Sequence, residues 1–287
     1  TFFDRRGLHR FDCADNLKLW LRMGSPLPGD HSGLVPAPTI ALDSGNPDVR
    51  SFSLRRPFKY AEFNHAAGDG GYNIAETSGR FSFSSAADGA ASTATSDLPF
   101  SISLLVYIEP ETNQTIVCKG TSNVSQCEYI ISIGDGLIGS VPAKFLNFRL
   151  QDGSSSNRET ARANLVINYD SVQSSMNKWY HVVCTYDGRG SSGVNPRDGM
   201  TVYINGADAT DVRSTDGSYV GMRPVYSAGL AVGQAGTASS VEFNGKLAEV
   251  AIWNKELSAK DATALYDYTV LNEGEPVSGF LNNPTRV

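Results

Sequence analysis

Short runs rich in β-branched and aromatic residues recur along the chain between clusters of Gly, Asn, Asp and Ser, and helical periodicity is almost absent. In Met200–Ile204, residues Met200, Val202 and Ile204 fall on one face, as in a half-buried antiparallel strand. Asn205 and Gly206 follow at once and suit the two positive-φ positions of a type I′ turn, which predicts a hairpin. The chain is therefore expected to be all-β. The other predicted strands are residues 81–83, 100–108, 115–118, 129–133, 145–150, 164–167, 179–186, 229–233 and 245–253.

The chain is large enough for a buried core. Its 287 residues, 40% of them hydrophobic, suffice for one large domain or two small ones. No window approaches the 18 or so consecutive apolar residues of a membrane-spanning helix. The formal charge of −6, without a cluster of Lys and Arg, argues against a nucleic-acid surface. We therefore expect neither nucleic acid nor a membrane as a partner. Residues 1–6 show no signal-peptide character, although a processed N-terminus would look the same and leaves secretion open.

One segment departs from the β pattern. Residues 258–268 begin with Ser258 as a cap, an acid follows at position 261, and Ala262, Leu265 and Tyr266 share a face. The sequence predicts a short amphipathic helix at this position.

The two ends of the chain lack regular alternation. Six prolines interrupt residues 1–75, and Pro and Asn dominate residues 272–287. We interpret residues 1–75 as an N-terminal arm or wrapping segment, residues 76–271 as one domain, and residues 272–287 as a C-terminal tail.

Five motifs follow one another in the second half of the chain: residues 179–188 (WYHVVCTYDG), 200–206 (MTVYING), 230–233 (LAVG), 243–258 (FNGKLAEVAIWNKELS) and the helix around 265–266. Their order resembles that of laminin-G-like domains of the concanavalin-A-like type, and residues 100–107 and 116–120 resemble the upstream strands of that family. The resemblance spans about residues 75–270. It implies an antiparallel jelly-roll β-sandwich with one short helix and extended terminal arms, with Trp179 at a framework position that anchors the core. It leaves function open, because this fold serves lectins, adhesion modules, hydrolase accessory domains and virion proteins.

A second resemblance lies near the N-terminus. Residues 17–24 (LKLWLRMG), followed by residues 43–46 (DSGN), resemble the lead-in of such domains in bacteriophage structural proteins. This resemblance favours a virion protein.

The sequence does not support catalysis. Glucanases of this fold carry a pattern resembling Glu-apolar-Asp-apolar-x-Glu on one strand, which places two carboxylates on one face for retaining hydrolysis. The corresponding stretch begins at Glu249, but Ala251 and Asn254 stand where the other acids would be. Glu249 is therefore interpreted as a strand residue with a structural hydrogen bond. His181 alternates with Trp179 and Val183 and is interpreted as a sheet histidine. A Ser/His/Asp triad assembled only in space stays open.

Two further patterns admit simple structural explanations. Residues 134–139 (GDGLIG) fit the glycine spacing of a dinucleotide site, but β-rich residues follow where such a site needs a helix, which favours a turn between strands. Asp152, Asp187 and Asp198 each precede a glycine at a strand end. They are candidates for one structural Ca²⁺ at the sandwich rim or, as we favour, for Asx turns.

The four cysteines are too few for a disulfide scaffold. Cys118 and Cys127 flank a loop that could close a hairpin and bring the two sulfurs together, and whether they are bridged stays open. Cys184 lies in an apolar run and is expected to be a buried free thiol. Cys13 is isolated.

These observations lead to a non-enzymatic protein with no residue assigned to catalysis, to a cofactor or to a metal. The main hypothesis is a virion structural protein, a capsid decoration or fibre component on the virion surface, that assembles with other virion or capsid subunits and as a homo-oligomer. The alternative is a carbohydrate-binding or adhesion module of a secreted or cell-surface protein, with cell-surface glycans as partners and an extracellular location.

Overall fold

The computed structural model of the protein describes residues 16–22, 29–30, 39–42, 48–52, 58–64, 70–75, 78–109, 114–120, 127–138, 141–152, 157–164, 178–191, 194–226, 228–235 and 242–270. Within these ranges, no helix is long and apolar enough to cross a membrane.

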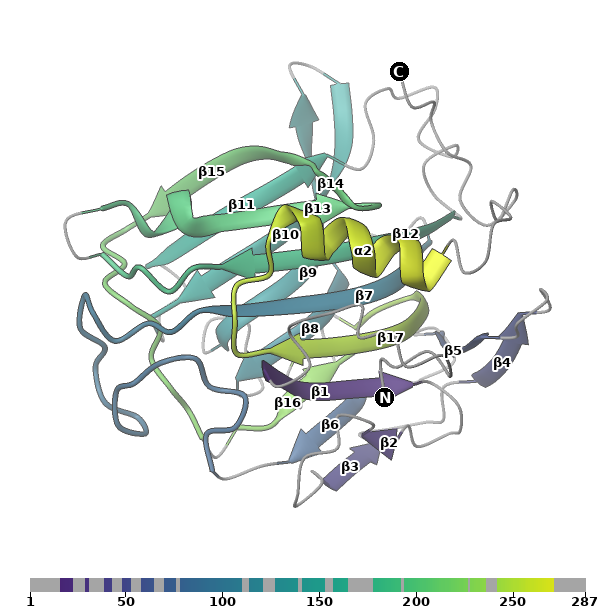
Figure 1. Ribbon diagram of the computed structural model, residues 1–287, viewed down its shortest axis with the longest axis horizontal. Coiled ribbons are helices and arrows are strands. Elements are labelled where there is room, and N and C mark those ends of the chain that lie inside the picture. Colours follow the sequence, from purple (N-terminus) through teal and green to yellow (C-terminus); the bar gives the residue numbers. More distant parts are fainter. Residues whose placement is uncertain are drawn as a thin grey trace.

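Two sheets stacked face to face make up the described structure (Figure 1). The front sheet has the order β14-β13-β12-β7-β17-β1-β2, with β5 also paired to β17 and β4 paired to β5. Its strands are β1 (Leu17–Arg22), β2 (Gly29–Asp30), β4 (Asp48–Phe52), β5 (Phe58–Phe63), β7 (Phe100–Ile108), β12 (Lys178–Tyr186), β13 (Met200–Ile204), β14 (Ala207–Asp208) and β17 (Gly245–Trp253).

The back sheet has the order β15-β11-β10-β9-β8-β16-β6-β3. Its strands are β3 (Thr39–Leu42), β6 (Tyr72–Ala75), β8 (Gln114–Gly120), β9 (Cys127–Ile138), β10 (Val141–Gln151), β11 (Arg158–Asn164), β15 (Thr210–Asp216) and β16 (Leu230–Val232). Every pairing between described strands is antiparallel. The expected antiparallel jelly-roll sandwich is confirmed.

The core lies between the sheets and draws alternate residues from both. Leu104 and Val182 point inward from the front sheet, and Ile131 and Phe148 point inward from the back sheet, all of them with at most 1% of their surface exposed. Phe100 is stacked on Phe83, with 4.4 Å between the ring centroids. Because side chains alternate along a strand, the intervening residues face outward.

The predicted hairpin and helix are both present, and they touch. Asn205 and Gly206 have φ values of 53° and 80°, as a type I′ turn requires. Helix α2 (Ala259–Val270) begins at the expected cap, where Ser258 Oγ accepts from the Asp261 amide and the Asp261 carboxylate accepts from the Ser258 amide. The helix crosses the outer side of the front sheet (Figure 1) and packs Leu265 there with Val183, Tyr203 and Trp253.

The N-terminal 75 residues differ from the expected arm, because their strands are part of both sheets. β1 pairs with the C-terminal half of β17, β5 pairs with its N-terminal half, and β6 lies between β16 and β3. Leu19 and Leu21 of β1 are fully buried in the core. The prolines of this segment lie outside the described residues. Residues 272–287 lie outside the described residues, and the domain boundary near residue 75 stays a prediction.

Trp179 is buried, but its position differs from the prediction. It has 4% of its surface exposed and packs with Tyr60, Leu105, Ala248 and Tyr266 in a cluster on the outer side of the front sheet. Alternation along β12 explains this, because Val182 and Cys184 take the inward positions and Trp179 therefore points outward. It anchors this outer cluster near α2 rather than the core between the sheets.

Candidate functional site

Glu249 lies in β17, as the sequence predicts, but at an irregular point. The pairing of β17 with β7 shifts register between Ala248 and Ala251, and Glu249 within this bulge has a φ of 49°. Ala251 faces the helix in an apolar cluster and Asn254 is exposed beyond the end of the strand. The carboxylate pair of a retaining glycosidase is therefore missing at this strand.

His181 is a sheet histidine, as expected. Its side chain is 1% exposed, and Nε2 lies 3.1 Å from the hydroxyl of Ser103. Burial lowers the pKa of His181 to about 3, so the ring is neutral at physiological pH.

The glycine pattern and the aspartates occupy strands and turns. Residues 134–138 lie in β9 and pair with β10, and Gly134 stands opposite Phe145. Asp187 accepts from the Arg189 amide at 3.0 Å, which is an Asx turn, and also from the Arg189 guanidinium at 2.7 Å. Asp152 accepts from the Asn157 side chain at 2.9 Å. The described residues contain no group of three or more His, Cys, Asp or Glu that could hold a metal ion.

The cysteines form one disulfide in the described structure. Cys118 on β8 is bridged to Cys127 on β9, with 6.3 Å between their Cα atoms, which answers the question left open by the sequence. Cys184 is a free, buried thiol, as predicted. Cys13 lies outside the described residues.

One end of the sandwich is built from loops around a buried carboxylate. We call it the loop end, comprising residues 78–99, 187–191, 194–199 and 217–226. Asp97, 5% exposed, accepts from the hydroxyls of Tyr186 at 2.9 Å and Tyr219 at 2.7 Å and from the Met222 amide at 2.7 Å. Burial raises the pKa of Asp97 to about 6, against the opposing effect of these hydrogen bonds. Asp97 therefore joins residues 78–99 directly to residues 217–226, and it reaches residues 187–191 through Tyr186, whose hydroxyl accepts from the Gly190 amide at 2.9 Å.

A second network lies near it. Glu128 is fully buried and accepts from the Ser82 hydroxyl and from the Phe83 amide at 2.7 Å. Burial raises the pKa of Glu128 to about 7, although the nearby Lys119 opposes this shift. Lys119 donates to the carbonyl oxygens of Val225 and Ala228. Each of these charged groups thus has hydrogen-bond partners within the fold.

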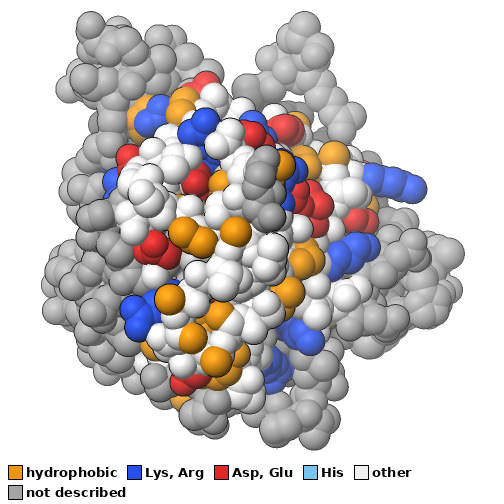
Figure 2. Space-filling model, turned by 90° about the vertical axis from the view of Figure 1, so that its left-hand side faces the viewer, with side chains coloured by type: hydrophobic (Ala, Val, Ile, Leu, Met, Phe, Trp, Pro, Cys, Tyr) orange, Lys and Arg blue, Asp and Glu red, His pale blue; other side chains and the backbone are white. Residues whose placement is uncertain are grey.

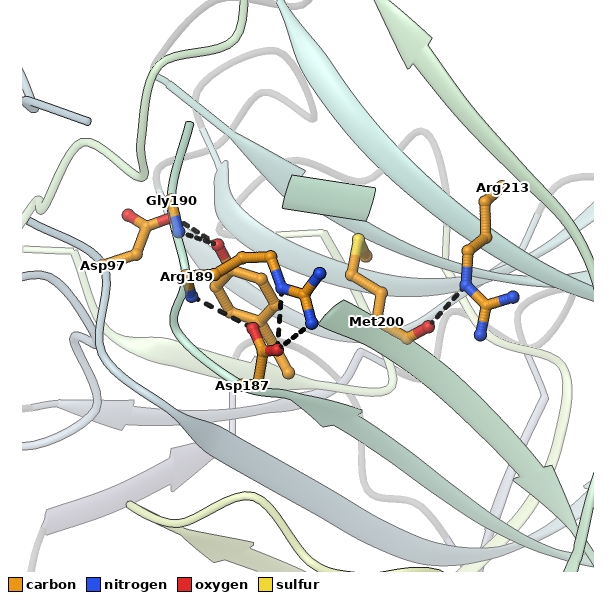
Figure 3. Close-up of polar contacts among 7 residues, drawn as sticks. Asp97, Asp187, Arg189, Gly190, Met200 and Arg213 are labelled. Atoms are coloured by element: carbon orange, nitrogen blue, oxygen red, sulfur yellow. Dashed lines mark hydrogen bonds and ion pairs between the residues drawn. The ribbon is translucent and has the colours of Figure 1, made fainter. Parts of the chain in front are cut away.

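Figure 3 shows Asp97, Asp187, Arg189 and Gly190 gathered at the loop end, and Arg213 donating separately to the Met200 carbonyl. Figure 2 looks onto this end and shows small apolar areas set among uncharged polar atoms, with acidic and basic side chains scattered between and around them. Leu98, Val194 and Val220, which are 42%, 48% and 39% exposed, lie on its loops. The polar groups here hold the loops in place.

The outer face of the back sheet is different. There the positions between the core residues carry polar side chains, which we call the polar face: Thr115 on β8, Ser132 on β9, Asn147, Arg149 and Gln151 on β10, and Thr160 and Arg162 on β11. Leu146, Phe148 and Leu150 point into the core, so the residues between them point outward. The register sets Asn147 opposite both Ser132 and Arg162, and Arg149 opposite Thr160. These residues therefore lie side by side across four strands, and all of them except Arg149 and Arg162 are buried.

Several polar atoms of this face lack a partner. The Thr115 hydroxyl, the Gln151 amide oxygen and the Nε atoms of Arg149 and Arg162 are all buried without a hydrogen bond. Thr115 is fully buried and Gln151 is 3% exposed. The Arg162 guanidinium lies over the ring of Phe145, 3.9 Å from its centroid. Burial, and then the charge of Arg158, lowers the pKa of Arg149.

The sequence reasoning assigned no role to these residues. A usable signal was nevertheless present, because residues 145–151 read FLNFRLQ and place Asn147, Arg149 and Gln151 at every second position. What the pattern could not show is which of these polar groups finds a partner. An unpartnered buried donor or acceptor costs roughly 1–3 kcal/mol, so these atoms are a cost to the stability of the fold.

The two antiparallel sheets define a β-sandwich. Residues 84–263 match the family described as the concanavalin A-like lectin/glucanases superfamily, and the chain belongs to this family. No curated protein matches the chain.

Solved structures with the same fold include large binding domains. One is the binding domain of botulinum neurotoxin DC in complex with rat synaptotagmin II, with 17% identity and a TM-score of 0.57, where the match covers 90% of this chain and 52% of the other. A second is the binding domain of Paraclostridial Mosquitocidal Protein 1, with 17% identity, a TM-score of 0.56 and coverage of 90% and 53%. The chain thus spans about half the length of these domains. At this level of identity, the likeness shows the fold alone.

Proposed function

We propose that this chain is a non-catalytic carbohydrate-binding module that acts outside the cell. The observation that carries the proposal is the match of residues 84–263 to the concanavalin A-like lectin/glucanases superfamily. The carboxylate pair that a glucanase of this fold needs is missing from β17, which favours binding over hydrolysis.

Two further facts support the proposal. The binding domain of botulinum neurotoxin DC has been solved in complex with SialylT, and cell entry of botulinum neurotoxin type C depends upon interaction with two ganglioside molecules. Both proteins share the fold of this chain. The Cys118–Cys127 disulfide suits an oxidising environment outside the cytosol. The comparisons therefore favour a carbohydrate-binding module over a virion structural protein, whose role, like homo-oligomer formation, stays a prediction.

The test is a glycan array probed with the full chain, followed by calorimetry on the glycans that bind. We expect binding by the parent chain and by Lys260→Gln, a control on the exposed surface of α2. The same chain unfolded in urea should bind none of these glycans, because binding requires the folded sandwich. A folded chain that binds no glycan would overturn the proposal.

A further inference from the structure

The interface between helix α2 and the front sheet contains a buried imidazole. His181 projects from the outer side of β12 with 1% of its surface exposed, and the ring of Tyr266 on α2 faces it, with 6.0 Å between the ring centroids. Nε2 of His181 lies 3.1 Å from the Ser103 hydroxyl, but Nδ1 is buried without a hydrogen-bond partner. One nitrogen of the ring thus has a partner and the other has none.

A second proton on this ring would have no acceptor. A protonated imidazole donates from both nitrogens, and the Ser103 hydroxyl can accept from only one of them. Burial alone lowers the pKa of His181, and no charged group of the described residues contributes to the shift. The docked helix therefore holds His181 in its neutral form.

The elements around His181 offer no charge that would stabilise a protonated ring. β7 has no charged residue, and the turn after β13 presents Asn205, whose side chain accepts from the His181 amide. The titratable groups of the surrounding elements are Lys178 on β12, Asp208 on β14, Lys246 and Glu249 on β17, Lys260, Asp261 and Asp267 on α2, and the phenols of Tyr60, Tyr107, Tyr203 and Tyr266. Lys246 is paired with Glu62 at 3.4 Å, and Asp261 caps the helix. A proton on His181 would therefore be a buried, unpaired charge.

Helix α2 can separate from the sheet without breaking any strand pairing. It lies on the outer side of the front sheet (Figure 1), where it packs through Ala262, Leu265 and Tyr266. The segment that leads into it is held independently, because the Ser101 hydroxyl donates to the Lys255 carbonyl and accepts from the Leu257 amide. A hinge at residue 258 would therefore let the helix leave while β17 and this segment stay in place.

We propose that α2 is an acid-sensitive lid: protonation of His181 releases the helix from the front sheet and uncovers the apolar side chains of Val183, Tyr203 and Trp253 beneath it. Water can then accept from both nitrogens of the charged ring. Because the docked form disfavours the proton, docking is at full strength above about pH 7 and weakens as the pH falls through 6.5, the value for an imidazole in water. Between pH 7.5 and pH 5.0, the equilibrium should shift towards the released helix roughly thirtyfold.

Hydrogen–deuterium exchange of the full chain tests the lid, with rates corrected for the intrinsic pH dependence of exchange. Peptides that cover residues 259–270 report on α2, and peptides from β9 and β10 serve as an internal reference. The variants are His181→Gln and Thr185→Val. Thr185 is the matched control, since its hydroxyl is also buried without a partner on β12 but does not titrate. We expect the protection of α2 to fall roughly thirtyfold from pH 7.5 to pH 5.0 in the parent and in Thr185→Val, and to stay constant in His181→Gln.

Three outcomes would overturn the proposal. They are constant protection of α2 in the parent, an equal fall in His181→Gln, and a loss of protection in β9 and β10 together with α2, which would mean general unfolding. Should His181→Gln not fold, a nuclear magnetic resonance titration of the parent replaces it. The signal of the protonated His181 ring should then grow in step with the loss of α2 protection, and a protonated ring beneath a protected helix would contradict the lid. The test needs no glycan, so its outcome is independent of the proposed function.

Discussion

The loop end and the polar face both contain polar side chains out of contact with solvent, but they differ in how these groups are satisfied. Asp97 has three donors from two segments of chain, whereas Arg149 and Gln151 have atoms with none. At the loop end, the buried polar groups donate to and accept from one another and hold the loops in place. On the polar face, some buried donors and acceptors have no hydrogen-bond partner. Buried polar groups thus stabilise the fold where they are satisfied and reduce its stability where they are not.

The largest effect should come from removing the carboxylate of the loop end. Asp97→Ala leaves the buried hydroxyls of Tyr186 and Tyr219 and the Met222 amide without their acceptor, and should cost about 3–5 kcal/mol in the free energy of unfolding. Urea unfolding measures it, with the exposed Asp211→Ala as the control. Equal midpoints for the two variants would mean that the network does not hold the loops.

The disulfide tests whether the polar face depends on a covalent link between two of its strands. Cys118 and Cys127 join β8 and β9 across nine positions of sequence, and the double variant Cys118→Ser/Cys127→Ser should lose about 2–3 kcal/mol of stability. Urea unfolding with and without a reductant measures this. If a reductant leaves the parent midpoint unchanged and the double variant matches it, the link contributes nothing to stability.

The pH dependence of stability should also distinguish the two regions. Burial raises the pKa of Asp97 from 3.8 to about 6 and that of Glu128 from 4.5 to about 7, so the folded chain binds these protons more tightly than the unfolded chain does. Their stabilising contribution is complete below about pH 4 and is lost as the pH rises through 6 to 7. Glu159, with its pKa raised by burial to about 6, acts in the same direction.

His181 opposes this trend, because its lowered pKa favours the unfolded chain once the pH falls below about 6.5. The three carboxyl groups outweigh it between pH 8 and pH 5, and we expect a higher urea midpoint at pH 5. Glu128→Gln should flatten the profile, while Gln151→Ala on the polar face should leave it unchanged. A midpoint that falls steadily from pH 8 to pH 5 would contradict the expectation.

The smallest expected change in stability comes from a substitution that tests whether a buried hydroxyl of the polar face lacks a hydrogen-bond partner. Thr115→Val replaces a buried hydroxyl without a partner by a methyl group of similar size, and should change stability by less than about 1 kcal/mol, towards greater stability. The matched change in the satisfied network is Ser82→Ala, which removes a donor from Glu128 and should destabilise the chain. Destabilisation by both changes would show that the Thr115 hydroxyl has a partner after all.

The sequence predicted correctly those elements whose conformation depends only on a few neighbouring residues. The Asn205-Gly206 turn and the Ser258 cap belong to this class, because turn conformation and capping depend on immediate neighbours. The pairing of β1 with β17 depends instead on residues more than two hundred positions apart. The prolines of the first 75 residues hid these short strands. The alternation in β1, where Leu19 and Leu21 turn out to face the core, was visible in the sequence but was not used.

The candidate site was less accessible from sequence for a related reason. Alternation along β10 places Asn147, Arg149 and Gln151 on one face, but only the register with β8, β9 and β11 shows that Thr115, Ser132 and Arg162 join them. Whether a polar atom has a partner depends on distances across strands that no local pattern contains. Trp179 shows the same limit, since its burial was predicted and the side of the sheet it packs on was not.

The turn at Asn205 and Gly206 affects how readily the protein is deamidated. In a flexible chain, the backbone nitrogen of a glycine after asparagine attacks the asparagine amide carbon, and ammonia is lost. Here the Asn205 side chain is held by the His181 amide at 3.0 Å. The Gly206 carbonyl accepts from Thr263 of α2. An added Cβ on Gly206 would meet Tyr266 at 3.1 Å, so the helix closes directly over the turn. The docked helix therefore protects the Asn-Gly dipeptide of the hairpin from deamidation. The rate at which Asn205 is converted to aspartate would then report the fraction of time that α2 is detached from the sheet.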